Sequence, residues 1–423
     1  METDLMNIIG SISTRDKMVR YLDGYAAERM EELDERKMKR PLTKSYLVEH
    51  ACDSDKAKSI KDIMDSVSVP IEMIEEGLYR VRDHYDGEYF GFLETLSPRY
   101  FVIYTLYESQ QSDRWIRNLI LRCPELDHVW LSGLTFNVLW QRVVQLNNPN
   151  RYVKIMFQHD SIYQVDGETF ESEEEETSTF PDESDIAEII ERRASKFSLV
   201  DRISIVKEKL SKLQELYSPL YAINQLRFPS PIGRGGHDFF DNGKVTNRSG
   251  NFRDHRSHII YVQRIYDELM KVTESKAWYS IQKETVAIPG TFQRLVGAPL
   301  SIKFSDPLSQ ETLEYWLKST FGRLRNRFRL WGNPIKLGPT KFHVYGIDRH
   351  LWQPIFMEIT ANHLIAIIPK GTCGNTVHRL VTNIQRYIDP AASVFVGDTK
   401  YEEMVEESSR GVKYERETSR TVQ

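Results

Sequence analysis

The chain has 423 residues, of which 40% are hydrophobic and 11% aromatic, and its formal net charge is −5. This length predicts two or three domains, and the apolar content excludes a largely disordered chain. The mild negative charge argues against a protein that coats nucleic acid with its whole surface.

Three cysteines, Cys52, Cys123 and Cys373, lie far apart in the sequence. Their spacing excludes a zinc site built from the cysteines of one segment and predicts a reducing compartment. The first residues lack the pattern of a signal peptide, and the longest apolar run, at residues 365–369, is too short to span a bilayer. We therefore expect a cytoplasmic protein with no membrane contact.

Residues 1–98 are expected to form a helical, winged-helix-like part. Amphipathic helices are predicted at residues 59–67 and 71–82, followed by β-rich runs at residues 89–93 and 100–106. In a winged helix the second helix would meet the DNA bases, but here it carries Glu72, Glu75 and Glu76 near its start. These carboxylates would repel phosphate, so the pattern favours a packing or protein-contact module.

Residues 99–166 alternate between strand and helix patterns, which predicts a small α/β layer with parallel strands. The expected strands cover residues 101–106, 128–131 and 152–157, and the helices cover residues 114–122 and 136–146. Residues 167–187 are expected to be an acidic linker, because nine carboxylates and no base occur between residues 168 and 185.

Residues 188–286 are expected to hold two helices on either side of a long loop. Apolar residues spaced by four and three predict a short heptad seam, which either pairs with another chain or lies on this one. The seam consists of Leu199, Ile203, Val206, Leu210, Leu213 and Tyr217. The second helix is predicted over residues 255–272.

Residues 287–398 predict a split-βαβ (ferredoxin-like) domain. Its expected order is a strand at 300–304, a helix at 309–331 capped by Ser309, strands at 342–347 and 354–368, a helix at 375–388, and a strand at 393–396. The run at 354–368 is a candidate hairpin that turns at Ala361-Asn362. Residues 399–423 lack an apolar period and are expected to be a disordered charged tail, so the predicted fold class is multi-domain α+β.

The segment at residues 227–258 combines glycine, histidine, basic and phenylalanine residues without an evident helix or strand period. Arginines bind phosphates, glycines let backbone N–H groups approach anions, and phenylalanines offer faces on which bases stack. The predicted nucleic-acid contacts are Arg234, Lys244, Arg248, Arg253 and Arg256, with stacking by Phe239 and Phe252. Arg323 and Arg327 would extend this site as a basic ridge of the C-terminal domain.

The same segment also contains residue types that bind transition metals. His237, Asp238, His255 and His258 could hold zinc or manganese, and Asp254 or Asp241 could complete or orient the ligands. The spacing is ordinary, so a structural interpretation, with Asp254 as a helix N-cap, remains open.

Cys373 lies before a predicted helix, where a thiol could act as a nucleophile with His378 or His343 as its base, although a buried small residue is more common there. The preferred function is a non-enzymatic component of a larger assembly that binds nucleic acid or another polyanion without a cofactor. The alternatives are a metal-dependent phosphodiesterase or nuclease at the histidine cluster, and an interaction scaffold that uses the heptad helix to bind protein partners.

Overall fold

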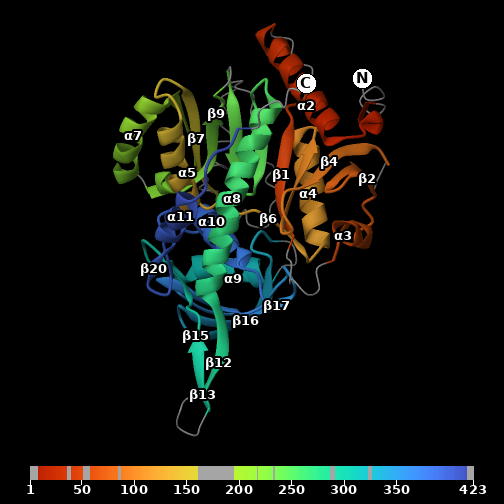
Figure 1. The fold of residues 1–423 in the computed structure, drawn as a ribbon. Coiled ribbons are helices and arrows are strands. Elements are labelled where there is room, and N and C mark those ends of the chain that lie inside the picture. The colour runs from red at the N-terminus through yellow and green to blue at the C-terminus, as the bar shows by residue number, and fades with distance from the viewer. Residues whose placement is uncertain are drawn as a thin grey trace, which may run out of the picture.

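The computed structural model describes residues 8–35, 40–50, 58–83, 87–160, 195–216, 218–231, 234–285, 291–322 and 326–416. The fold is mixed α+β, as predicted, and its strands form two mainly antiparallel sheets (Figure 1). The segment expected to be an acidic linker, residues 167–187, lies outside the described residues.

The first sheet contains strands from three of the predicted segments. Its order is β2 (Ile71–Glu75), β3 (Leu78–Arg82), β4 (Tyr89–Thr95), β5 (Tyr100–Thr105), β1 (Lys44–His50), β11 (Lys244–Asn247), β10 (Gly236–Phe240), β9 (Ile223–Pro229), β7 (Tyr152–His159) and β8 (Ser195–Arg202), with β6 (Leu126–His128) beside β1. Strands from residues 1–98, 99–166 and 188–286 therefore pair within one sheet, whereas β12, at residues 278–285, belongs to the second sheet.

Helices cover both faces of this sheet, which explains why its central strands have no solvent-exposed face. Alternate residues of β1 enter different cores: Leu47 packs with α2 (Arg15–Asp34) and α8 (Phe252–Ala277) residues, while Tyr46 and Val48 pack with α3 (Ile60–Ser66) and α4 (Ser109–Arg122). The first of these cores also takes in α5 (Gly133–Leu146) and α7 (Ile203–Leu216). A strand buried on both faces has no alternation to detect in the sequence.

The predicted second helix of the winged helix, at residues 71–82, is wrong, because β2 and β3 form an antiparallel hairpin there. The hairpin turns at Gly77, whose φ of 71° lies in the left-handed region that glycine adopts without strain. The apolar residues Met73, Ile74 and Leu78 fit a helical period as well as this hairpin, so the helix that would have met DNA bases is not formed.

The elements predicted for residues 99–166 occur in the expected order, but their arrangement differs. β5 and β6 both pair antiparallel with β1, and β7 pairs antiparallel with β8 and β9. The expected parallel layer is thus wrong, because β1, β8 and β9 come from other parts of the chain and lie between or beside these strands.

The predicted heptad seam is divided between two elements. Leu199 lies in β8, and α7 begins only at Ile203. Ile203, Val206 and Leu210 are buried in the core of the first sheet, so the seam packs against its own chain. Leu213 is exposed, and Tyr217 lies outside the described residues.

The second sheet has the order β15 (Leu330–Gly338), β16 (Lys341–Asp348), β17 (Gln353–Thr360), β18 (His363–Pro369), β14 (Leu300–Lys303), β19 (Ser393–Val396) and β20 (Thr399–Lys400). β12 (Trp278–Thr285) joins β18 and forms with β13 (Thr291–Val296) a hairpin that extends away from the body (Figure 1). The predicted turn at Ala361-Asn362 is confirmed, since it separates β17 from β18.

Helices α9 (Gln310–Phe321), α10 (Asn375–Tyr387) and α11 (Tyr401–Arg410) contribute to the core on one face of the second sheet. The Ser309 cap is confirmed, because its side chain accepts a hydrogen bond from Thr312 N. The helix ends ten residues earlier than predicted: Gly322 is its C-cap, and Asn326 Nδ2 donates to the carbonyls of Thr320 and Leu330 across the following turn.

The prediction that residues 399–423 form a disordered tail is wrong for residues 399–410. Tyr401, Met404 and Val405 of α11 are buried against the second core. These three residues follow a helical spacing that the surrounding charges conceal. None of the helices in the described parts of the chain has the length and apolar composition that crossing a bilayer requires.

Two arginines of α10 connect the two sheets. Arg379 bonds to Asp127 of β6 and to Asp348 at the end of β16, and all three side chains are buried. About two helical turns later, Arg386 lies 2.8 Å from both Asp160 and Asp241, which follow strands of the first sheet. The helix is buried on every side and is anchored by charge rather than by apolar contact alone.

We expect Arg386→Ala to lower the free energy of unfolding by about 3–5 kcal/mol, because the substitution removes the cation from two buried carboxylates. Urea unfolding followed by circular dichroism would measure the change. Arg410→Ala is the control: its side chain is 73% exposed and lies 3.7 Å from Glu406, so about 0–1 kcal/mol is expected. Equal effects of the two substitutions would contradict a central role for Arg386.

Candidate functional site

The segment at residues 227–258 is not a loop. It forms the last three residues of β9, all of β10 and β11, and the first turns of α8, and β10 and β11 are buried throughout. The glycines permit close backbone packing: Gly235 has φ of 80°, and a Cβ there would lie 2.0 Å from the carbonyl oxygen of Arg248. The glycine-rich composition therefore reflects a tight strand connection.

Most basic residues predicted to bind phosphate are paired with carboxylates of this chain. Arg248 and Arg227 both bond to Asp238, and Arg256 binds Glu94 with two nitrogens. The other pairs are Lys244 with Asp113, Arg253 with Asp23 and Arg234 with Asp34. Only the last pair is largely exposed among these, with 82% of the Arg234 side chain accessible, so the segment does not present a basic surface.

The predicted stacking and ridge residues are also placed differently. Phe239 and Phe252 are fully buried core residues that no base could reach. Arg327 follows the end of α9, with its guanidinium 5.9 Å from the ring centre of Tyr387, and Arg323 lies outside the described residues. The prediction of an arginine ridge on a helix is wrong, because α9 ends before the first of these arginines.

The three histidines of the segment do converge. His237 Nε2 lies 2.8 Å from Asp254 Oδ2, and His237 Nδ1 lies 3.3 Å from Nδ1 of His255. His255 in turn contacts Ser45 Oγ of β1 at 2.8 Å. All four side chains are buried, so this chain of contacts crosses the core between the first sheet and α8.

Asp254 is the centre of this network rather than the N-cap of α8, which is Asn251. Ser230 Oγ donates to its Oδ2 at 2.7 Å, and the Tyr414 hydroxyl donates to its Oδ1 at 2.9 Å. Burial raises the pKa of Asp254, but the neighbouring imidazoles and the hydrogen bonds from His237 and Ser230 outweigh this effect and hold the pKa below its ordinary value. Both carboxylate oxygens therefore already have donors.

His258 completes the cluster. Its Nδ1 contacts the Asp254 carbonyl at 2.8 Å, and burial lowers its pKa to about 3, so the ring is neutral at physiological pH. Ligand-type atoms of His237, Asp254 and His258 lie within 4.8 Å of one another. The predicted ligand Asp238 is not among them, because it pairs with two arginines, and His255 contacts the group through His237. The arrangement is a satisfied hydrogen-bond network that rigidifies the core.

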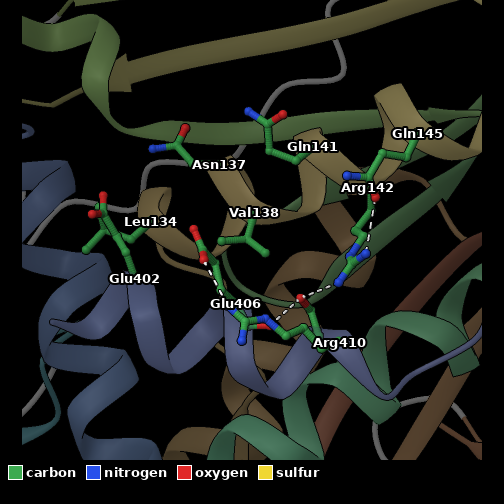
Figure 2. A pocket seen from close by; sticks show the side chains of 10 residues that line it. Leu134, Asn137, Val138, Gln141, Arg142, Gln145, Glu402, Glu406 and Arg410 are labelled. Atoms are coloured by element: carbon green, nitrogen blue, oxygen red, sulfur yellow. Dashed lines mark hydrogen bonds and ion pairs between the residues drawn. The ribbon is translucent and has the colours of Figure 1, made fainter. Parts of the chain in front are cut away.

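A pocket of about 480 Å³ lies between α5 and α11 (Figure 2). Three of its charged side chains interact with one another or with nearby polar groups: Arg142 donates to Ser409, and Arg410 lies 3.7 Å from Glu406. None of the residues that line it belongs to the histidine cluster. It offers no set of groups that converge on one ligand atom.

One face of the second sheet has no covering helix among the residues that the structure describes, and we call this surface the open face. It presents exposed aromatic and aliphatic side chains from β15 to β18. Cross-strand pairing arranges them in rows: Trp331 pairs with Ile347, Tyr345 with Phe356, and Phe356 with Ile367. The exposed members are Trp331, Ile335, Leu337, Tyr345, Phe356 and Ile367, and Trp352 precedes β17.

The degree of exposure is unusual for such side chains. Tyr345 is 61% exposed and Trp331 is 47% exposed, although both lie in regular strands. The Tyr345 and Phe356 rings meet edge to face at 5.7 Å, which leaves ring surface directed outward. A contiguous apolar surface of this kind commonly marks an interaction site.

The carboxylate of Glu358 on the open face is paired with neighbouring side chains. Glu358 bonds to Lys341, His343 and His363, which hold its pKa at about 2 and neutralise the carboxylate. The sequence of residues 341–348 predicted a strand in this region, but it did not predict which side of the strand would be exposed. Its role could not be recognised without knowing that α9 and α10 cover the opposite side.

We expect Tyr414→Phe to lower the free energy of unfolding by roughly 1–3 kcal/mol, because Asp254 Oδ1 loses its donor while remaining buried. Chemical denaturation would measure the loss. Tyr152→Phe, at a tyrosine that is 60% exposed, is the control and should change stability by less than about 0.5 kcal/mol. If Tyr414→Phe is equally silent, the residues after α11 do not close the network.

Comparison with known proteins gives a family relationship over most of the chain. The family described as MJECL33-like protein matches residues 6–403. The protein MJECL33 of Methanocaldococcus jannaschii is 21% identical over 372 residues, which cover 82% of this chain and 85% of that protein. A search of solved structures gave no match. On the extent of the family match, the chain belongs to the MJECL33-like protein family.

Proposed function

We propose that the protein binds single-stranded nucleic acid on the open face of the second sheet. The observation that carries this proposal is the set of exposed aromatic rings on neighbouring strands, above all Tyr345 and Phe356. Unpaired bases offer flat faces that stack on such rings, whereas paired bases in a duplex are already stacked on each other.

The order of the strands supports this proposal. The order β19, β14, β18, β17, with α9 after β14 and α10 after β18, is compatible with the split-βαβ (ferredoxin-like) arrangement that we propose for this domain, with β15 and β16 inserted between α9 and β17. One class of RNA-binding modules stacks bases on aromatic residues of a four-stranded sheet. The similarity is one of architecture alone, so the exposed rings carry the proposal.

The charges of the open face define the expected mode of binding. Lys341 and Lys303 lie on or beside this face, and Glu358 is neutralised by its partners. With so few cations, stacking rather than phosphate neutralisation would provide most of the affinity. The salt dependence of binding should accordingly be shallow.

The proposed binding site on the open face differs from the site at residues 227–258 that was predicted from the sequence. In the described structure the basic residues at 234–256 pair with Asp and Glu side chains, whereas the open face has exposed rings that no other part of the described chain covers. The nuclease alternative depends on the histidine cluster, whose carboxylate oxygens are already occupied. The scaffold alternative depends on a heptad helix that packs on its own chain.

We expect Tyr345→Ala and Phe356→Ala each to weaken binding of a fluorescent single-stranded oligonucleotide of about 20 nucleotides by roughly tenfold. The reason is that each substitution removes one stacking surface, which contributes on the order of 1–3 kcal/mol per base. Fluorescence anisotropy with DNA and RNA oligonucleotides, and with a duplex of the same length, would measure the change.

Tyr152→Ala is the matched control, because this tyrosine is 60% exposed on β7 of the first sheet, against 61% for Tyr345. It should leave the affinity unchanged. The proposal is overturned if the wild-type protein does not prefer single strands, or if the open-face substitutions leave binding intact. Self-association that is lost in Tyr345→Ala, without nucleic-acid binding by wild type, would instead identify this face as an interface between two copies.

A further inference from the structure

A second group of ligand-type side chains lies where the two sheets meet. Glu49 of β1, His350 in the turn between β16 and β17, and Cys373 just before α10 each contribute one atom, and these atoms lie within 4.8 Å of one another. All three residues are at most 3% exposed. They come from distant parts of the sequence, so no local motif indicates the cluster.

Two acceptor atoms of this cluster lack partners. Glu49 Oε2 and His350 Nε2 are buried, and neither has a hydrogen-bond partner among the described residues. The other oxygen of Glu49 accepts from Arg99 at 2.7 Å and from the Cys373 thiol at 3.0 Å. Buried polar atoms are nearly always satisfied, so these two atoms require an explanation.

The hydrogen bond at the other ring nitrogen determines the chemistry of His350. Its Nδ1 lies 2.9 Å from the carbonyl oxygen of Pro124, which can only accept, so Nδ1 carries the proton. In the neutral ring Nε2 then offers a lone pair. A backbone carbonyl that orients a histidine in this way is a common feature of metal ligands.

The surroundings of Cys373 favour a thiolate once a cation is present. Arg99 Nη2 lies 3.2 Å from Sγ, and the Asn375 N–H points to Sγ at 3.4 Å. In the structure as it stands, burial holds the pKa of Cys373 well above its ordinary value, so the thiol alone is not an activated nucleophile. Hydrogen bonds to sulfur from outside the ligand set are typical of metal–thiolate centres.

Charge balance indicates the valence of the cation. Glu49 and Glu274 are both paired with Arg99, which leaves one excess negative charge when all three are ionised. A thiolate at Cys373 would add a second. A divalent cation would make this buried group neutral, which is the condition under which buried charges are tolerated.

We propose that Glu49, His350 and Cys373 bind a zinc ion at the junction of the two sheets. Zinc accepts sulfur, imidazole nitrogen and carboxylate oxygen together, and three protein ligands leave a fourth position for water. Each ligand belongs to a different element, so the ion would link β1, the turn after β16 and the start of α10. Sites with one open position are also those in which zinc activates water.

The test measures metal content and the optical spectrum of the full-length protein after loading with zinc or cobalt and removal of free metal. We expect about one zinc per chain and, with cobalt, a thiolate-to-metal charge-transfer band in the near ultraviolet. Cys373→Ser should abolish this band and weaken zinc binding by more than about 100-fold, because loss of an outer-sphere partner alone costs about 10–100-fold. His350→Ala should also lose stoichiometric zinc.

Cys123→Ser is the matched control, since Cys123 is a buried free cysteine outside the cluster, and it should retain both zinc and the band. If the ligand variants do not fold, the wild-type protein decides: zinc should protect one thiol from a thiol reagent, and a chelator should expose it. Zinc lost in His258→Ala but kept in Cys373→Ser would place the ion at the histidine cluster and overturn the proposal. So would a wild-type protein that holds no zinc and shows no band.

Discussion

The relative position of the two sheets depends on the buried charges of α10. Arg379 is bonded to carboxylates of both sheets at once, Asp127 and Asp348, and all three side chains are buried. A buried ion pair of this kind contributes little net stability compared with apolar contacts, but it strongly penalises any arrangement that leaves one charge alone. The pairs therefore select one orientation of the sheets. The turn between β16 and β17 is brought to the end of β1 as a result.

The same principle explains why the basic residues of 227–258 misled the sequence interpretation. Arg256 is separated by 162 residues from Glu94, the carboxylate that it binds, and Arg248 binds Asp238, which a local view counted as a metal ligand. Composition records how many cations a segment has, but only the fold determines which of them remain available to a ligand. In this chain many charged side chains of the first sheet are buried where strands meet helices. The open face of the second sheet instead exposes aromatic and aliphatic side chains.

Prediction succeeded where local chemistry determines structure. The Ser309 cap, the turn at Ala361-Asn362 and the helix over residues 375–388 are each encoded within a few residues. It failed where tertiary contacts decide: β10 and β11 are buried on both faces and have no alternation, so their residues appeared to form a loop. For the candidate sites, the sequence offered a cluster of His237, His255 and His258 only as an alternative, and the Tyr345 face and the Cys373 cluster required knowledge of which elements pack together.

One short turn connects the two proposed sites. His350 and Leu351 both bond to the Pro124 carbonyl in the connection between α4 and β6, and Leu351 and Trp352 have positive φ, a conformation that costs energy for such side chains. The turn thus directs His350 inward to Cys373, while Trp352, 55% exposed, lies outward at the start of β17. A zinc ion bound to His350 would stabilise this strained turn and thereby hold Trp352 in place. If zinc in this way raised the affinity for nucleic acid that contacts Trp352, linkage requires that the nucleic acid raise the affinity for zinc by the same factor.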